Sequence, residues 1–546
     1  MSVTREQQQF PTRNYPYRGQ PRGAVAPLEP VLPNTLYRRV LGLDAGHSPM
    51  TPEELRQLTD PFGRLLRSGQ PFPLTLKQVL AALDALNGTP NALPDQLVFL
   101  AADGGHIPWT PETDGLQRAF RFVVARGAGE FTLLISSSTR IESAENGAFL
   151  QVIGWDATHE VFHYYERLFG VFFWAGMSPH ALADGTRGLG PFDSHVNGSL
   201  VMKELRAPWV HWHAPQAGIN EEAFAPNDPL RNEPLFRNRV SAERLESEVV
   251  RPGIRRWNEA RVRKAVGADG VWRQAHHFLR QAITDTTVNL ATSDTASRSL
   301  TDEMRLRPPH TFFLNSDTLF DTLGLAPDDP AVADITISGA HFRQLLARYD
   351  AHRTDGALRI NGDSHFAFLT PEPAFEDTNL IDVMMQAGLL TPRFTAALAM
   401  TDFSNPVFSP RRAALLRYTP TELSVNPTAG EALASRFVEN VQAVIANNEH
   451  HAAAPDSPER EFLANWETEN FETVYRRRIT DYLLAAQSGM NNLDIVDGWF
   501  RLAEYRRRRF RRRPLAEFNL TTPRTNIPEN APPLRMTLQG RVEPLA

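Results

Sequence analysis

Hydrophobic positions follow a helical spacing in the early part of this chain. Residues 51–54 read Thr-Pro-Glu-Glu, which supplies an N-cap, a proline at the first helical position and two acids in the first turn. A second stretch opens at Thr75, carries leucine and valine at helical spacing and reaches a stop at Gly88. These patterns predict two helices within a helical region.

The spacing changes to an alternation of apolar and polar residues from about residue 116 to 176. Two pairs of alternating segments are each joined by a short turn, and a further apolar segment follows at 171–176. Strands with such short connections pair antiparallel, because a parallel pair needs a crossover of about a dozen residues or more. We therefore predict an α+β protein in which an antiparallel meander or small barrel is packed among helices.

Helical periodicity returns after the sheet, and proline-rich stretches without periodicity stand at both ends of the sequence. No internal repeat or long low-complexity linker marks a domain boundary, so we expect one interlocked body with both proline-rich arms extended on its surface. By pattern and composition the chain divides into an extended N-terminal arm (1–35), a helical region (36–115), the antiparallel sheet with a histidine-rich stretch (116–220), a second helical region (221–300), a mixed α/β region (301–428), a third helical region ending in an arginine run (429–513) and an extended C-terminal tail (514–546).

The composition excludes several classes of chemistry. The chain has no cysteine, which removes disulfides, thiolate nucleophiles, iron–sulfur clusters and thiolate-bound zinc. A net charge of −6 over 546 residues gives no general attraction for a polyanion. No apolar run approaches the ~18–20 residues that span a bilayer, and the polar N-terminus lacks the apolar centre of a secretion signal, so we expect a soluble cytoplasmic protein.

The segment 191–213, called the central stretch below, holds the densest set of side chains that bind metals or move protons. It contains three of the 16 histidines of the chain. His211 and His213 are separated by one residue, so on a strand both imidazoles point to one side. A turn at 197–199 can bring them back to His195, and we predict a metal site of these three histidines with an open position for water or oxygen. Packing of the imidazoles against tryptophan and backbone is the alternative.

Three further polar residues of the central stretch are candidates for catalysis. Lys203 is one of only three lysines in a chain whose basic residues are otherwise arginine, and it neighbours Glu204. If residues 200–205 form a short strand, Lys203 and Glu204 face opposite sides, and one of them faces the pocket. Asp193 lies near the start of the stretch. We therefore predict Lys203, Glu204 and Asp193 as the catalytic set of an active site here.

Two other pairs of polar residues have spacings that metal ligands use. Asp363 and His365 form a D-x-H pair that a non-haem iron site could use, although Asp363 follows an Asn-Gly turn signal and could bond its own backbone instead. His159 and His163 flank a predicted hairpin turn, where we do not expect the two side chains to converge. A structural role is the favoured interpretation of both pairs.

Seven of the eight residues at 506–513, the arginine run, are arginine. Such a run binds phosphates, and the aromatic residues beside and within it could stack on bases. Because the chain is net acidic and Pro514 ends any helix there, we favour ion pairing with acids of this chain or of a neighbouring subunit. An anionic protein or lipid surface is the remaining alternative.

The function that these patterns favour is that of a soluble enzyme. No phosphate-binding loop, dinucleotide-binding glycine motif, hydrolase elbow or zincin motif is present. The histidines of the central stretch favour an oxidoreductase that depends on a transition metal or a non-covalent haem and acts on a small-molecule substrate. The alternative is a non-catalytic assembly or binding protein whose terminal arms and arginine run engage neighbours, for example in a homo-oligomer. Nucleic acid is not an expected partner.

Overall fold

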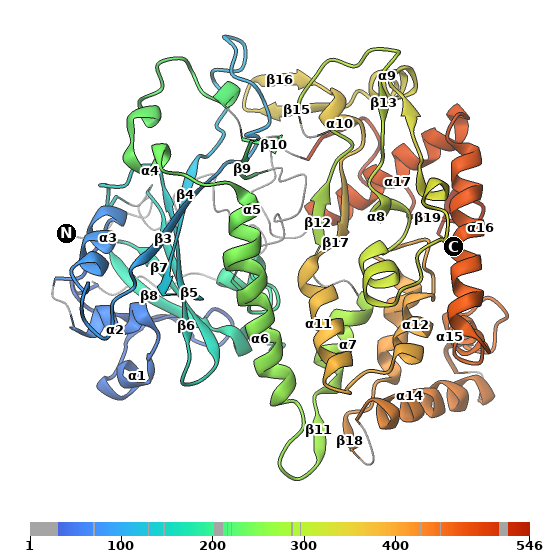
Figure 1. Ribbon diagram of the computed structural model, residues 1–546, viewed down its shortest axis with the longest axis horizontal. Helices are drawn as coiled ribbons and strands as arrows, with labels where there is room; N and C mark the ends of the chain where they lie inside the picture. Colours follow the sequence, from blue (N-terminus) through green and yellow to red (C-terminus); the bar gives the residue numbers. More distant parts are fainter. Residues whose placement is uncertain are drawn as a thin grey trace. The chain divides into compact units, whose positions relative to one another are not determined.

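The computed structural model describes residues 31–545 apart from 69–70, 129, 146–147, 201–210, 216, 220, 285–287, 295, 426–428, 448 and 513–521. The described part combines helices with a large, mostly antiparallel sheet, which confirms the α+β class. Its contacts group into two compact units, where the sequence analysis expected one interlocked body. The first unit runs to Trp257 and includes Thr354–Arg359, and the second comprises Asn258–Arg353, Ile360–Arg512 and 522–545 (Figure 1).

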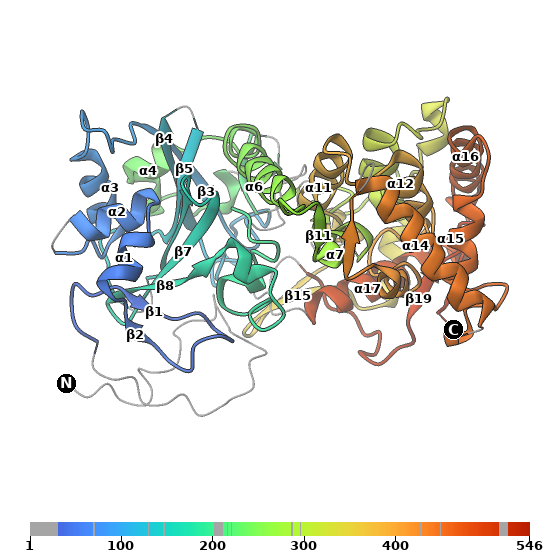
Figure 2. The same cartoon turned by 90° about the horizontal axis from the view of Figure 1, so that it is seen from below.

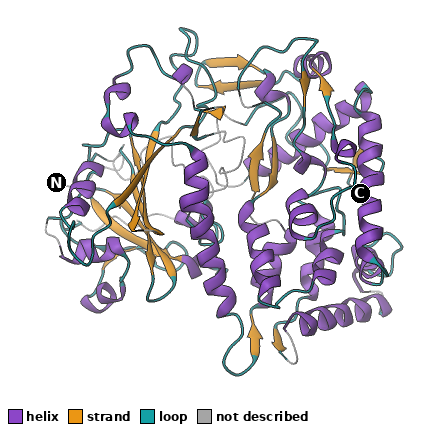
Figure 3. Ribbon diagram, in the orientation of Figure 1, coloured by secondary structure: helices purple, strands orange, loops and turns teal. Residues whose placement is uncertain are grey.

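An eight-stranded sheet organises the first unit, and Figure 3 draws its strands in orange. The strand order is β2-β1-β8-β7-β6-β5-β4-β3. Neighbouring strands pair antiparallel except β1 and β8, which are parallel. The predicted meander is therefore confirmed, but the sheet is open, with β2 and β3 at its edges, and does not close into a barrel. The strands are β1 (Tyr37–Arg38), β2 (Ser48–Pro49), β3 (Asp95–Ala101), β4 (Arg121–Ala128), β5 (Glu130–Ser138), β6 (Leu150–Asp156), β7 (Val161–Leu168) and β8 (Val171–Met177).

One face of this sheet packs against the helices α1 (Pro52–Gln57), α2 (Pro61–Ser68) and α3 (Leu76–Asp84). Both predicted helix starts are confirmed, because Thr51 and Thr75 each form a capping box with the residue three positions on. Alternate residues of the strands, such as Phe122, Val124 and Val152, join the helical leucines in a common core. This face of the sheet is apolar and covered by the three helices, and it is called the closed face.

The opposite face is covered by the segment after β8, by the helix η5 (Leu245–Val250) and by the part of α6 (Arg251–Arg263) up to Trp257, all within the first unit (Figure 2). The guanidinium of Arg256 lies 4.6 Å from the Trp155 ring of β6 and donates to the Phe131 carbonyl of β5 at 3.1 Å. A Cβ on Gly253 would lie 2.1 Å from Cδ1 of Leu200, so α6 and the central stretch approach closely here. The central stretch is thereby held close to the sheet.

The second unit is mainly helical, with four small two-stranded sheets. Its helices are α7 (Ala275–Thr284), α8 (His310–Phe313), α9 (Gly339–Arg348), α10 (Ser364–Ala367), α11 (Phe375–Gln386), α12 (Pro392–Ala399), α13 (Pro410–Ala414), α14 (Ala429–Ala446), α15 (Pro458–Trp466), α16 (Phe471–Gly489) and α17 (Leu493–Arg511). Its paired strands are β11 (Val271–Arg273) with β18 (Glu422–Ser424), β12 (Val288–Ala291) with β17 (Thr370–Pro373), β13 (Arg305–Leu306) with β14 (Ile337–Ser338), and β19 (Leu534–Met536) with β20 (Val542–Pro544).

The described part of the C-terminal tail packs into the second unit. Its hairpin β19–β20 buries Met536 in the core around α16 and α17, and the indole of Trp499 donates to the Gly540 carbonyl at 2.8 Å. This packing differs from the extended surface arm expected here, because the prolines hide a short apolar pattern in the tail. The predicted N-terminal arm lies outside the described residues, apart from 31–35. Of the helices that the structure describes, none is both long and apolar enough to cross a bilayer.

Candidate functional site

A cavity lies on the face of the sheet opposite α1–α3, within the first unit. Its volume is about 70 Å³, roughly the volume that two molecules of liquid water occupy. One wall is formed by side chains of the strands β4 to β8. The other wall belongs to the central stretch, which contributes Pro191, Ser194, His195, Leu200 and Trp212. The segment singled out in the sequence thus forms a wall of a cavity.

The register of the sheet places a row of polar side chains along this cavity. Ser136 of β5 pairs with Gln151 of β6, which in turn pairs with Glu166 of β7. All three line the cavity together with Arg121 of β4. Arg121 and Glu166 are buried, and the guanidinium of Arg39 lies 3.8 Å from the Glu166 carboxylate. A guanidinium and a carboxylate therefore lie on the first and last of four adjacent strands.

Trp212 enters the cavity from an extended segment at the end of β3. The Ala102 N–H donates to the His211 carbonyl at 2.8 Å, and Trp212 forms an antiparallel bridge with Ala101. The chain then continues into the short hairpin β9 (His213–Ala214) and β10 (Ala217–Gly218). Trp212 is 4% exposed, and its indole N–H is buried without an acceptor among the described residues. The residue Trp212 thus brings to the cavity lining a hydrogen-bond donor that no described residue satisfies.

His195 reaches the cavity from a turn that backbone contacts fix. The Gly198 N–H donates to the His195 carbonyl at 2.9 Å, and Gly198 has a φ of +75°. A Cβ there would lie 2.5 Å from the Ser178 carbonyl oxygen, so only glycine fits. The Tyr164 hydroxyl donates to the Ser199 carbonyl at 2.7 Å, and the Tyr164 and His195 ring centroids are 5.4 Å apart. The turn expected at 197–199 is thus present.

The other two histidines of the predicted metal set lie against backbone carbonyls. Nδ1 of His211 is 3.2 Å from the Ala102 carbonyl oxygen, and Nδ1 of His213 is 3.1 Å from the Ile219 carbonyl oxygen. Burial, reinforced by the nearby Arg239 guanidinium, lowers the pKa of His213, so its imidazole is neutral at pH 7. Neither histidine lines the cavity.

Within the part of the chain that the structure describes, no three histidine, aspartate or glutamate side chains are grouped closely enough to hold a metal ion. His195 lines the cavity, whereas His211 and His213 alternate with Trp212 along an extended segment and so point to the side away from it. The alternation that makes the two imidazoles face one way also turns them from the cavity. The metal site of His195, His211 and His213 stays a prediction that this geometry does not support.

The predicted catalytic residues have different outcomes. Lys203 and Glu204 fall within 201–210, outside the described residues. Asp193 ends the short helix η2 (Gly190–Asp193), where its side chain is half-buried, and it is not among the residues that line the cavity. Sequence reasoning missed Arg121 and Glu166, because single charged residues within alternating strands give no signal until the register brings them together.

The buried Asp156 carboxylate and two histidines form a cluster on the closed face of the same sheet. His159 and His163, which were not expected to converge, both contact the same carboxylate oxygen of Asp156, at 2.8 and 3.2 Å. Burial alone would raise the pKa of Asp156, but hydrogen bonds from His163, His159 and Thr59 outweigh it and hold this pKa well below its usual range. The Trp174 indole donates to the other ring nitrogen of His163 at 3.0 Å, which makes the cluster structural.

The pair Asp363 and His365 of the second unit also has a structural role. The Asp363 carboxylate accepts from the Phe366 N–H at 3.1 Å and so caps α10, as its turn signal suggested. His365 is fully buried with Nδ1 at 2.9 Å from the Asp294 carbonyl oxygen. Burial lowers the pKa of His365 to about 4. The two side chains therefore serve separate parts of the backbone.

The arginine run bonds within its own chain over its described part. The Arg506 guanidinium is fully buried and donates to the Phe312 carbonyl at 2.6 Å. The buried Glu504 carboxylate accepts from Arg507 at 2.9 Å and from Arg511 at 2.7 Å. The predicted pairing with the chain's own groups is confirmed, and the burial of Arg506 and Arg507 leaves these two no surface for a partner.

Comparison of the chain with models of known protein families, with curated proteins and with solved structures finds no match. The geometry of the cavity is therefore what any functional conclusion must start from.

Proposed function

We propose that the first unit binds a small organic molecule in the cavity between the sheet and the central stretch, and that His195 exchanges a proton with this ligand. The observation that carries the proposal is the buried indole N–H of Trp212, which lines the cavity and has no acceptor among the described residues. A buried donor without an acceptor costs about 1–3 kcal/mol. An oxygen or nitrogen atom of a ligand would supply that acceptor.

The lining favours a ligand that has both an apolar body and polar ends. Val123, Leu134 and Ile153 give the cavity apolar walls, while Arg121 and Glu166 add opposite charges on separate strands. Small-molecule sites in proteins commonly combine such walls with a few polar groups that fix the orientation of the ligand. The volume of about 70 Å³ is about half that of a cavity of roughly 150 Å³ that holds benzene, so it limits the ligand to a few non-hydrogen atoms.

His195 is the side chain best suited to proton transfer in this lining. An imidazole carries one nitrogen that can accept a proton and one that can donate a proton, so a single side chain can serve in both directions. Glu166 adds a carboxylate to the same cavity, and imidazoles and carboxylates are common general bases. Proton transfer is favoured over the metal- or haem-dependent oxidation expected from the sequence, because His211 and His213 are engaged with carbonyls outside the lining.

Binding is tested by a thermal-shift screen of carboxylates, amines, alcohols and amides of a few non-hydrogen atoms against the full chain. A ligand at 100 times its Kd stabilises the folded protein by about 2.7 kcal/mol. Trp212→Phe keeps the ring and removes the donor, so the loss of one hydrogen bond of about 0.5–1.5 kcal/mol weakens binding roughly two- to tenfold. Trp466→Phe, in the second unit, is the matched control and leaves the affinity unchanged.

Proton transfer is tested separately with His195→Gln. This variant keeps a polar side chain but cannot titrate, so it should bind the ligand with an affinity close to that of the wild type. Proton uptake or release on binding, measured by calorimetry in buffers of different ionisation enthalpy, should disappear. The binding proposal is wrong if every compound that stabilises the wild type stabilises Ala175→Phe, which fills the cavity, by the same amount.

A further inference from the structure

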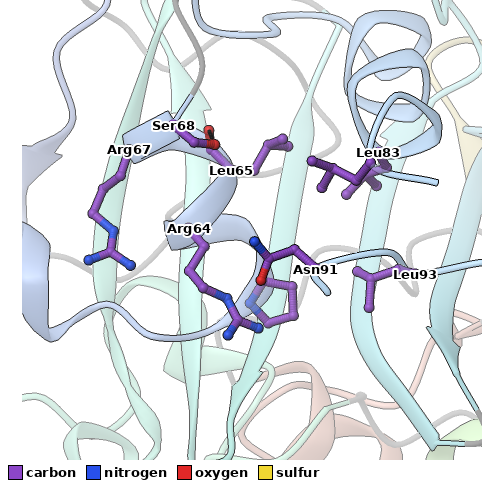
Figure 4. A pocket seen from close by; sticks show the side chains of 9 residues that line it. Arg64, Leu65, Arg67, Ser68, Leu83, Asn91 and Leu93 are labelled. Atoms are coloured by element: carbon purple, nitrogen blue, oxygen red, sulfur yellow. Dashed lines mark hydrogen bonds between the residues drawn. The ribbon is translucent and has the colours of Figure 1, made fainter. Parts of the chain in front are cut away.

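A second pocket of the first unit, the α2–α3 pocket, lies between α2 and the turn that follows α3 (Figure 4). Its volume is about 310 Å³, within the range of roughly 300–1,000 Å³ that small-molecule sites occupy. Leu65, Leu83 and Leu93 are largely buried and form much of its apolar wall. The pocket is separate from the cavity described above, because no residue lines both.

The wall of the α2–α3 pocket is fixed by a buried guanidinium. Arg126 of β4 is 2% exposed and donates to the Leu93 carbonyl at 2.7 Å, to the Asp84 carboxylate at 2.8 Å and to the Gln96 side chain at 2.8 Å. These bonds tie the end of α3 and the following turn to the sheet. Gly88, with a φ of +80°, closes the turn after α3. The pocket is therefore preformed, without a need for the ligand to order its wall.

Two cations of this pocket have no acid to pair with among the described residues. Arg64 and Arg67 are exposed on consecutive turns of α2, and the bond recorded for Arg67 is a long one, 3.5 Å, to the Arg56 carbonyl. The acid nearest on α3, Asp84, is already paired with Arg126 at 2.8 Å. Both Arg64 and Asn91 line the pocket, and Figure 4 shows that Arg67 extends away from Leu83 and Leu93. The pocket thus combines an apolar wall with an unneutralised positive edge.

We propose that the α2–α3 pocket binds a small amphipathic monocarboxylate. The apolar chain of the ligand packs against Leu65, Leu83 and Leu93, and its carboxylate accepts hydrogen bonds from the Arg64 guanidinium and the Asn91 amide. Arg67 adds attraction at longer range. A guanidinium holds a carboxylate through two parallel N–H···O bonds, which suits a planar anionic head. Cationic and neutral molecules with the same apolar chain have no carboxylate to accept these two bonds.

Octanoate is the probe for this site, titrated into the full chain and followed by ligand-observed NMR and calorimetry. Arg64→Gln should weaken octanoate binding about tenfold or more, because it removes a charge-assisted hydrogen bond of about 1.5–3 kcal/mol. Arg67→Gln should weaken it less, by at most about fivefold, as expected for a solvated charge. Arg436→Gln, on an exposed arginine of the second unit that pairs with Glu439, is the matched control and should have no effect.

Two further ligands distinguish the contribution of the carboxylate of octanoate from that of its apolar chain. Octyltrimethylammonium should not bind, since it carries the wrong charge, and acetate should bind far more weakly than octanoate, since it has no chain to bury. The proposal is overturned if Arg64→Gln binds octanoate as the wild type does, or if the cationic analogue binds equally well. It is also overturned if Trp212→Phe abolishes octanoate binding, because the acid then occupies the cavity of the central stretch.

Discussion

The indole Nε1–H of Trp174 donates to Nδ1 of His163, 3.0 Å away, and so fixes the ring proton of His163 on Nε2, which faces the buried Asp156 carboxylate at 3.2 Å. His163 and Asp156 are connected as the histidine and aspartate of a catalytic dyad are. Both ring nitrogens are engaged, however, so the imidazole is not placed to take a proton from a substrate. The cluster instead ties β6, β7 and β8 together on the closed face of the sheet.

Asp156→Asn should destabilise the first unit by about 3 kcal/mol, because it leaves buried donors without their charged acceptor. The pKa of Asp156 is lowered in the folded protein, so its contribution is fully present above the unfolded pKa of about 3.9 and is lost as the pH falls below that value. Urea unfolding at pH 7, 5, 4 and 3 measures both effects. The stability gap between wild type and variant should shrink below pH 4, and an equal gap at every pH would contradict the assignment.

His365 gives the second unit a different acid sensitivity. Its pKa is lowered to about 4 by burial, so the unfolded chain binds a proton at a higher pH than the folded one. The free energy of unfolding is therefore unaffected by His365 above the unfolded pKa of about 6.5. It decreases as the pH falls from there to about 4, by up to about 3 kcal/mol. His365→Gln should remove this pH dependence. Thermal unfolding of both proteins at pH 7, 6 and 5 provides the comparison, with His352→Gln, on a more exposed histidine, as the control.

The predictable parts of the fold are those that local chemistry decides. Thr51 and Thr75 cap helices because the residues three positions on carry the side chains of a capping box. The meander follows from alternation and short turns. By contrast, the Pro252-Gly253 pair reads as a helix break, yet α6 begins at Arg251 and runs through it. The residues before α6 form the π-helix η5, so the regular α-helical hydrogen bonding is already interrupted close to Pro252, which has no N–H to donate.

The candidate site was located by its residue density but not by its chemistry. The density of histidines in the sequence pointed to the central stretch, and the structure places this stretch along a cavity wall. The prediction put three histidines in one metal site, whereas only His195 of these three lines the cavity. The charged residues Arg121 and Glu166 lie 45 positions apart in the sequence, and only the register of the sheet brings them to one cavity. Long-range pairing of this kind leaves no local pattern.

Glu504→Gln tests whether the arginine run is a structural network. The Glu504 carboxylate is 1% exposed and neutralises Arg507 and Arg511, so its removal leaves buried positive charge uncompensated and should cost about 3–5 kcal/mol. Glu439→Gln breaks an exposed pair with Arg436 and should cost less than about 1 kcal/mol. Chemical denaturation compares the two. Similar small losses, together with salt-sensitive binding of random oligonucleotide by the wild type, would mean that the run serves an external polyanion instead.

Gly198→Ala should disrupt the turn that holds His195 in the cavity wall. Gly198 has a φ of +75°, and a Cβ there would lie 2.5 Å from the Ser178 carbonyl oxygen, so both strain and a clash with backbone follow. Gly170→Ala is the matched control, because Gly170 has a φ of +76° but open space around its Cβ position. The control should lose about 1 kcal/mol of stability from strain alone.

Gly198→Ala should lose about 2 kcal/mol or more of stability, and it should also lose the thermal stabilisation by a cavity ligand that Trp212 supports. Thermal unfolding with and without a ligand found in the screen separates the two losses, and an unchanged ligand response in Gly198→Ala would show that the position of His195 does not depend on this turn.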